Sequence, residues 1–301
     1  MKFIYLIVTS IMIICCILLG VFISSTDNSI KEINEDITII NERTQTLSQE
    51  ISGIKTETEE AKKILDDLQK EYDQLRITVY YKKNPTAFLT FDDGPSKYTD
   101  DILDILKQNN IKATFYCNAR QLDGTSVYDS VLKRIVDEGH VIAVHSYSHD
   151  YAEIYSSKEA FFNDLDKAIT ILEEKSGTKI NLIRLPSGTA SAKSFCEKYG
   201  GSADVFRQIM EELDSRGIFV SDWNIDTNDW SSKTTAESIV SEIKTTAASK
   251  LGATYKTALV LMHNKEKSAA ALPGVIAALK ELNFAFEPMQ PGGYAYIQRT
   301  N

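Results

Sequence analysis

Residues 86–96 read TAFLTFDDGPS, a short apolar run that ends in two adjacent carboxylates and a Gly-Pro turn. Five later runs share this short apolar character: ATFY (113–116), HVIAVH (140–145), LIRL (182–185), IFVSDW (218–223) and ALVLMH (258–263). Amphipathic stretches with helical spacing separate them. Such alternation is typical of βα units around a parallel sheet, so the sequence predicts an α/β fold, either a barrel or a doubly wound sheet. In a parallel barrel, functional residues lie at the carboxyl ends of the strands.

The composition fits one large globular domain, expected over residues 79–301, with accessory segments before it. The chain has 301 residues, 43% of them hydrophobic, and a formal net charge of −9. Because nucleic-acid binding depends on a basic surface, no nucleic acid is expected as a partner. Cys15 and Cys16 lie in an apolar run, which leaves Cys117 and Cys196 in the soluble part. Two free thiols are expected, although their pairing depends on geometry that the sequence does not give.

Residues 3–23, FIYLIVTSIMIICCILLGVFI, form an uncharged apolar run. Its length suits a helix that crosses a hydrocarbon core of about 30 Å, so we predict a transmembrane signal anchor over residues 1–25. Lys2 precedes the run and Asp27 follows it. The positive-inside tendency then places the N-terminus in the cytoplasm and the rest of the chain outside the cell. The alternative is a cleaved signal peptide, against which the long run and the lack of an A-x-A site argue.

Residues 26–78 carry the spacing of a coiled coil. Apolar residues recur at alternating intervals of three and four: Ile30, Ile33, Ile37, Ile40, Leu47, Ile51, Ile54, Ala61, Leu65, Leu68, Tyr72 and Leu75. Thr44 and Thr58 fill the two gaps. A period of about 3.5 residues, sustained without proline, predicts a coiled-coil stalk that can join copies of the chain, with the number of strands left open. The alternative is one long helix that packs against the globular domain.

Two strand ends carry the residue types of a metal site. Asp92 and Asp93 end the first run, and neighbouring carboxylates at a strand end point in different directions, so that one can bind a metal while the other faces substrate or water. His145 and His149 lie at the end of the third run, and both imidazoles can reach one ion if the chain turns helical there. Alone, the aspartate pair could be part of an ordinary turn, and the histidine pair could be a chance pair at the surface. At equivalent strand ends, each pair supports the other.

Three more strand ends supply polar or pocket-forming candidates. They are Arg184 with Ser187, Asp229 with Trp230, and Leu261 with His263. Each pair is a weak signal alone, but all of them follow apolar runs. The remaining histidine, His140, precedes its strand and is expected to be structural.

In their order and position, these five clusters resemble the five motifs of the polysaccharide deacetylase family, whose catalytic unit is the NodB homology domain. The resemblance covers about residues 86–288. It implies a distorted (β/α) barrel. It also implies that Asp93, His145 and His149 bind a divalent metal, usually Zn²⁺, with Co²⁺, Ni²⁺ and Mn²⁺ as alternatives.

The same resemblance assigns catalytic roles. It makes Asp92 the general base and His263 the general acid. Arg184 would orient Asp92, and Asp229 would tune His263.

Substrate contacts follow from the resemblance as well. Leu261 would form a wall of the acetyl pocket, Trp230 would line the groove, and the backbone N–H of Ser187 would stabilise the oxyanion. The chain departs from the common pattern at two positions. Ser187 stands where many members carry an aromatic residue or glycine, and Asn264 stands where aspartate commonly follows the histidine.

The expected function is therefore that of a metal-dependent hydrolase that removes N-acetyl groups from an extracellular polysaccharide. The anchor and stalk favour peptidoglycan, with N-acetylglucosamine or N-acetylmuramic acid as the reacting sugar. Chitin oligomers, exopolysaccharide and acetylated xylan are alternative substrates. A non-catalytic, membrane-tethered glycan-binding scaffold is the alternative from another class.

Overall fold

The computed structural model describes residues 2–298, and side chains from residue 8 onward. The chain forms two compact units, residues 1–71 and 72–301. Residues 1 and 299–301, at the outer ends of the predicted anchor and globular domain, lie outside the described residues.

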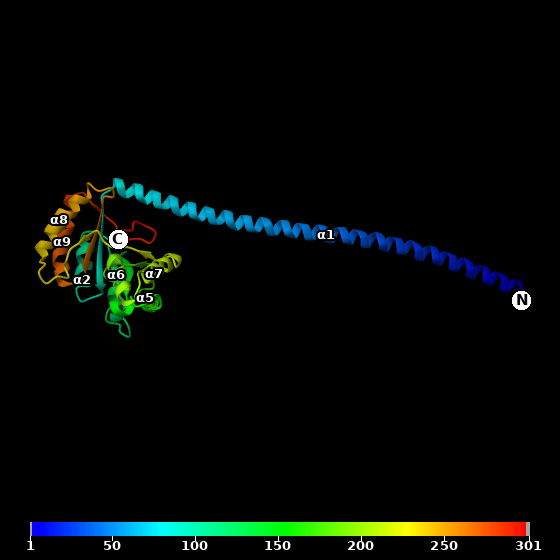
Figure 1. Cartoon of the computed structure of the whole chain (residues 1–301), viewed down its shortest axis with the longest axis horizontal. Helices are drawn as coiled ribbons and strands as arrows, with labels where there is room; N and C mark the ends of the chain where they lie inside the picture. The colour runs from blue at the N-terminus through cyan, green and yellow to red at the C-terminus, as the bar shows by residue number, and fades with distance from the viewer. Residues whose placement is uncertain (1, 299–301) are drawn as a thin grey trace. The chain divides into compact units, whose positions relative to one another are not determined.

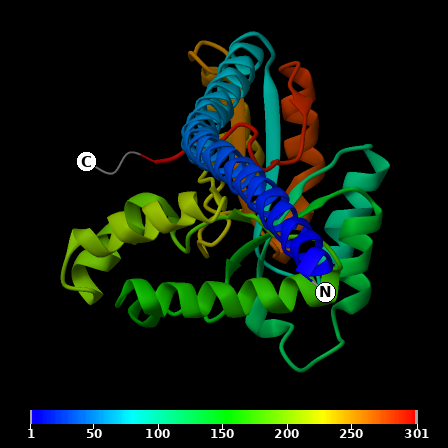
Figure 2. The same ribbon diagram turned by 90° about the vertical axis from the view of Figure 1, so that its right-hand side faces the viewer.

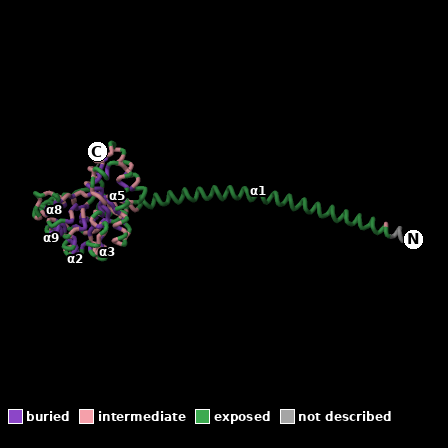
Figure 3. Tube along the Cα trace, turned by 90° about the horizontal axis from the view of Figure 1, so that it is seen from below, coloured by how far each residue is buried: buried purple, intermediate pink, exposed green. Residues whose placement is uncertain are grey.

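Helix α1 (Lys2–Lys83) forms the first unit as far as residue 71 (Figure 1). The last turns of this helix belong to the second unit. Side chains along residues 8–71 are exposed almost throughout (Figure 3). Within the described part of the chain, α1 is long and apolar enough near its start to cross a membrane, by length and composition. A signal sequence near the N-terminus passes the same test, so the anchor, its orientation and the coiled coil stay predictions.

The second unit is built on a parallel sheet of eight strands. They are β1 (Thr86–Gly94), β2 (Thr114–Asn118), β3 (Val141–Ser146), β4 (Leu182–Ile183), β5 (Phe219–Val220), β6 (Ile225–Asp226), β7 (Thr257–His263) and β8 (Ala285–Phe286). Their order is β5-β4-β3-β2-β1-β7-β6, and β8 pairs with β1 beside this path. The predicted α/β class is confirmed. The barrel is a half-barrel, because β5 and β6 are the two ends of the strand order and no pairing joins them among the described residues.

Helices cover the outer face of this half-barrel. They are α2 (Thr99–Gln108), α3 (Asp129–Asp137), α4 (Tyr151–Ile154), α5 (Lys158–Ser176), α6 (Gly188–Tyr199), α7 (Ala203–Ser215), α8 (Ala236–Lys250), α9 (Glu266–Glu281) and the 3₁₀ turn η1 (Ala119–Gln121). Neighbouring contacts run from α8 to α9, α2, α3, α5, α7 and α6 in turn. Figure 2 shows part of this series, with α5 in green at the bottom, α7 in yellow-green at the left and α9 in orange-red at the right.

The alternation of side chains along each strand divides the apolar residues between two faces. Ala87, Leu89 and Phe91 of β1 join the large core under the helices, whereas Phe88 joins a smaller cluster on the opposite face. That smaller cluster also contains Tyr81 from the end of α1. The C-terminal segment adds Met289 to it, and Tyr294 and Tyr296 pack against it. The concave face of the half-barrel is therefore closed by residues from both ends of the second unit.

His140, expected to be structural, and the two cysteines of the globular domain are buried. The Nδ1 of His140 accepts a hydrogen bond from the backbone N–H of Ala113 at 3.0 Å. Burial lowers the pKa of His140 to about 4, so its ring is neutral at ordinary pH. Cys117 and Cys196 are buried free thiols, as predicted.

Candidate active site

The two adjacent aspartates point apart because the end of β1 is bulged. The pairing of β1 with β2 runs from Asp92 directly to Gly94, so Asp93 is the extra residue of a β-bulge. Its φ is 63°, in the left-handed region that aspartate tolerates better than most residues. Asp92 stays in register with His263 on β7 and is 3% exposed. The bulge therefore presents two carboxylates of one strand to different parts of the same site.

The two histidines converge through a loop and not through a helical turn. His145 lies in β3, and His149 follows in a loop with φ of 56°. Asp164 on α5 accepts the backbone N–H groups of Tyr147 at 2.8 Å and Ser148 at 2.7 Å. The left-handed residue turns the chain back, and the carboxylate from a distant helix holds that turn.

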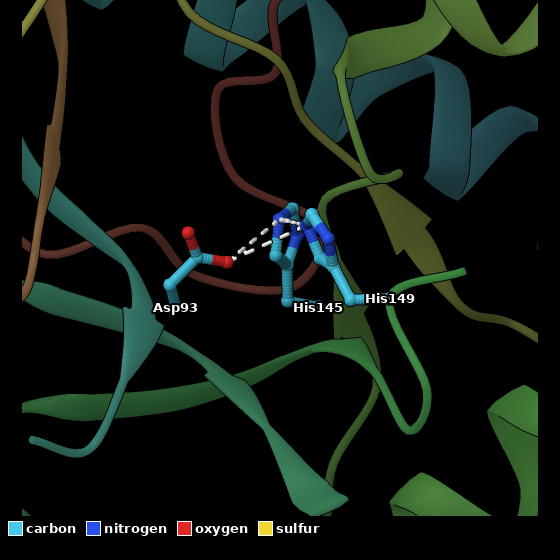
Figure 4. A group of neighbouring side chains, drawn as sticks. All are labelled: Asp93, His145 and His149. Atoms are coloured by element: carbon cyan, nitrogen blue, oxygen red, sulfur yellow. Dashed lines mark hydrogen bonds and ion pairs between the residues drawn. The ribbon is translucent and has the colours of Figure 1, made fainter. Parts of the chain in front are cut away.

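Asp93, His145 and His149 form a group with the donor set of a divalent metal site (Figure 4). The Nε2 atoms of the two histidines are 3.3 Å apart, and the Asp93 Oδ1 lies 3.7 Å from the first and 3.4 Å from the second. Tetrahedral zinc with bonds of about 2.0–2.1 Å separates its ligands by about 3.3–3.4 Å. The Asp93 Oδ1 is buried and has no hydrogen-bond partner among the described residues. An unsatisfied carboxylate oxygen facing two imidazole nitrogens fits a bound cation.

The histidine rings are held in the form that a metal requires. The Nδ1 of His145 lies 2.8 Å from the carbonyl oxygen of Arg184, so this nitrogen carries the proton and Nε2 keeps its lone pair. Burial and the neighbouring His145 lower the pKa of His149, which favours a neutral ring there as well. Burial acts to raise the pKa of Asp93, but the nearby imidazoles outweigh it and lower that pKa.

A buried arginine holds Asp92. The Arg184 side chain is 0% exposed, and its Nη1 donates to Asp92 Oδ1 at 2.8 Å. The same guanidinium donates to Thr90 Oγ1 and to two backbone carbonyls after β5, and it lies over the ring of Tyr116 at 4.1 Å. A buried charge needs such complete pairing. The other oxygen, Asp92 Oδ2, is 4.0 Å from His145 Nε2 and so faces the metal site.

A second buried carboxylate holds His263. The Asp229 Oδ1 lies 2.6 Å from His263 Nδ1, and its Oδ2 accepts the backbone N–H of His263 at 2.7 Å and the hydroxyl of Ser268. Burial acts to lower the pKa of His263, but the hydrogen bond and charge of Asp229 outweigh it and raise that pKa. The imidazolium form is therefore favoured, with Nε2 as the remaining proton-bearing nitrogen.

These groups share one pocket of about 370 Å³. Its walls include the predicted substrate contacts Ser187, Leu261 and Trp230, and Trp230 is 62% exposed at the surface. Sequence reasoning did not single out four other lining residues: Tyr151, Ser191, Trp223 and Lys265. Tyr151 and Ser191 lie on helices after the strand ends, where the pattern of apolar runs carries no signal. Trp223 is the last residue of the run IFVSDW, and Lys265 lies two residues after the run ALVLMH, so a position at or near the end of a run was the available signal.

One parallel half-barrel thus brings a carboxylate, two imidazoles, a second carboxylate and a third imidazole to one pocket at the carboxyl ends of its strands, an arrangement suited to a hydrolase. The sequence profile described as polysaccharide deacetylase matches residues 80–218. A peptidoglycan-N-acetylglucosamine deacetylase of Bacillus cereus is 31% identical over 210 residues, which span 68% of this chain and 70% of that protein. The chain belongs to the polysaccharide deacetylase family, and the resemblance found in the sequence is confirmed.

Solved structures agree with this assignment. The catalytic domain of a peptidoglycan N-acetylglucosamine deacetylase from Eubacterium rectale superposes with a TM-score of 0.64 at 31% identity, covering 72% of this chain and 94% of that chain. A polysaccharide deacetylase from Bacillus cereus superposes with a TM-score of 0.59 at 28% identity, covering 71% of this chain and 96% of that one. The half-barrel is therefore the fold of this family.

Proposed function

We propose that this protein is a metal-dependent deacetylase that hydrolyses the N-acetyl groups of peptidoglycan. The observation that carries the proposal is the convergence of three ligand atoms, one of them an unpartnered carboxylate oxygen, between Asp92 and His263 in one pocket. Hydrolysis of an acetamide needs an activated water, stabilisation of a developing oxyanion and protonation of a poor leaving group. The described residues offer a group for each need.

Asp93, His145 and His149 would hold the divalent ion. When bound there, it supplies a Lewis acid that polarises the acetyl carbonyl. Zn²⁺ suits a set of two imidazoles and one carboxylate, and such a set leaves a coordination position open to substrate. Mn²⁺, Co²⁺ and Ni²⁺ accept the same donor types.

Asp92 is the proposed general base. Its Oδ1 is occupied by Arg184, whereas Oδ2 faces the metal ligands. This oxygen takes a proton from the attacking water as the water oxygen bonds to the carbonyl carbon. Because Arg184 is itself held by several acceptors, the carboxylate cannot swing away during the reaction.

His263 is the proposed general acid. Asp229 holds its Nδ1, so the proton on Nε2 is available to the amide nitrogen as the C–N bond breaks. Ser187 and Leu261 line the pocket. The backbone N–H of Ser187 is the proposed oxyanion donor, and Leu261 is proposed to contact the acetyl methyl. Acetate and a glucosamine amine leave, and the proton taken by Asp92 balances the one given by His263.

The names of similar proteins favour peptidoglycan and N-acetylglucosamine. Relatives that are 31% identical to this chain carry the name peptidoglycan-N-acetylglucosamine deacetylase. A fungal chitin deacetylase is 34% identical over 149 residues, so chitin oligomers are the natural competing substrate. The test incubates the full-length protein, in detergent and with zinc, with muropeptides and with chitin oligomers, and then measures the masses of these glycans by mass spectrometry. Loss of acetyl from muropeptides is expected; turnover of chitin alone would reject peptidoglycan, and no turnover of any glycan would favour the scaffold.

The N-terminal helix is proposed to anchor the enzyme in the cell membrane, with residues 26–78 as a stalk and the catalytic domain outside the cell. An uncharged apolar run followed by an acidic, solvent-exposed helix supports this placement. Protease added to intact cells should digest the catalytic domain. Without protease, the catalytic domain should sediment with the membranes. If the catalytic domain resists protease in intact cells but is digested in lysates, it lies inside the cell.

A further inference from the structure

A fully buried carboxylate outside the proposed reaction lies behind the active site. Asp222 follows β5 and is 0% exposed. Its Oδ1 accepts the backbone N–H of Thr189 at 3.0 Å, and its Oδ2 accepts the hydroxyl of Thr189. A buried carboxylate is expensive unless several donors satisfy it, so these contacts define a built arrangement.

The C-terminal segment supplies further contacts to the same residue. The backbone N–H of Asp222 donates to the carbonyl oxygen of Tyr296 at 2.7 Å, and the backbone N–H of Gln298 donates to Asp222 Oδ2 at 2.8 Å. The segment also closes around Gly188, where an added Cβ would lie 3.0 Å from the Gln298 Oε1 and 2.9 Å from the Trp223 ring. The end of the chain is thus packed against the turn that precedes α6.

That turn needs outside support. Ser187 has φ of 67°, which is unfavourable for a residue other than glycine. It is also the N-cap of α6, yet its side chain makes no capping bond. Asp222, from another part of the chain, caps the helix instead: its Oδ1 accepts the backbone N–H of Thr189 in the first turn of α6. Its negative charge also suits a helix N-terminus.

We propose that Asp222, held by residues 296–298, is a positioning residue that fixes the Ser187–Thr189 turn in its reactive geometry. The inference rests on the proposed function, because Ser187 lines the catalytic pocket and its N–H is the proposed oxyanion donor. The C-terminal segment then belongs to the catalytic apparatus, although its described residues 296–298 lie outside the pocket wall. Asp222 acts through the turn and touches no substrate.

The test combines kinetics with a measurement on the turn itself. Asp222→Ala in the full-length protein should lower kcat about 10²-fold, the usual effect of a small misplacement in an active site, with KM changed by less than about threefold. Zinc content should stay that of the parent, because the metal ligands lie on other strands. Asp222→Asn keeps an acceptor for the Thr189 N–H and should restore most of the rate. A chain that ends at Ile297 lacks the Gln298 contacts and should show a smaller loss of kcat.

Amide hydrogen exchange reports on the turn without requiring turnover. Asp222→Ala should speed exchange in peptides that contain residues 187–190 and leave those of β1 and β3 unchanged. Ser202→Ala is the matched control: Ser202 caps the neighbouring helix α7, so its loss should destabilise the protein slightly and leave kcat and exchange at the turn unchanged.

The outcomes separate the two proposals. Parent-like kcat and parent-like exchange at residues 187–190 in Asp222→Ala would overturn the positioning role. Loss of zinc together with accelerated exchange throughout the domain would also overturn it, because Asp222 would then be a general stability residue. If the parent protein deacetylates no glycan, the proposed function fails, and the exchange of the turn still decides the role of Asp222.

Discussion

Replacing the two neighbouring aspartates separately should give two different defects. Asp93→Ala removes one of three ligand atoms, so both zinc and turnover should be lost. Asp92→Asn keeps the size of the side chain and an oxygen for Arg184, so zinc should remain bound while the rate falls. A positioned base is worth about 10²- to 10⁴-fold, which corresponds to about 3–5.5 kcal/mol of activation free energy.

The expected effect of Asp92→Asn on stability is too small to imitate this rate loss. Arg184 keeps its charge and its carbonyl and hydroxyl acceptors, and the acceptor of its hydrogen bond at 2.8 Å changes from a carboxylate to a neutral amide oxygen. That change costs about 1–3 kcal/mol. Domains have about 5–15 kcal/mol of stability, so more than about nine tenths of the molecules should remain folded.

The assay measures zinc per protein, melting temperature and deacetylation rate on purified variants. Asp137→Asn is the control, because Asp137 lies on the exposed surface of α3 and, among the described residues, forms an ion pair with Lys133 alone. An Asp92→Asn protein that sheds zinc, or one that keeps a rate within about tenfold of the parent, would refute the proposed base. An Asp93→Ala protein that keeps both metal and activity would refute the proposed ligand.

Three further outcomes are expected. Asp229 raises the pKa of His263 against the effect of burial, so Asp229→Asn should lower that pKa and shift the alkaline fall of kcat to lower pH; an unchanged alkaline limb in a pH-rate profile would contradict this. Chelation of the metal should abolish turnover and lower the melting temperature, and added zinc should restore both. In His149→Ala, zinc should no longer raise the melting temperature measured by calorimetry. Residues 26–301 should sediment as an oligomer and residues 72–301 as a monomer, because most of the heptad spacing, from Ile30 to Leu68, lies before the second unit. Equal monomer masses in analytical ultracentrifugation would reject the coiled coil.

The pattern of the sequence was sufficient for the fold class and for the list of groups in the site. Short apolar runs separated by helical stretches predicted a parallel sheet, and parallel strands place their carboxyl ends at one edge. The positions of Asp92, His145 and His263 at the ends of such runs therefore predicted that they meet, without knowledge of the strand order. Membership of the family followed from the same residues.

Orientation within the site depended on backbone details that no periodicity encodes. The extra residue at Asp93 and the left-handed residue at His149 decide where their side chains point, and both conformations are held by tertiary contacts. The sequence allowed the two imidazoles to reach one ion if the chain turned helical after His145, whereas in the structure a loop with a left-handed residue brings them together.

Residue types, their order and the apolar rhythm are local properties, and the sequence by itself determined the parallel α/β fold, the family and the candidate ligands. Only the tertiary structure decided that the barrel stays open, that the C-terminal segment packs against its concave face, and that Asp222 joins this segment to the turn at Ser187. These features depend on contacts between residues up to about two hundred positions apart along the chain. Their energy comes from burying apolar surface and satisfying buried polar groups, which only the folded chain specifies.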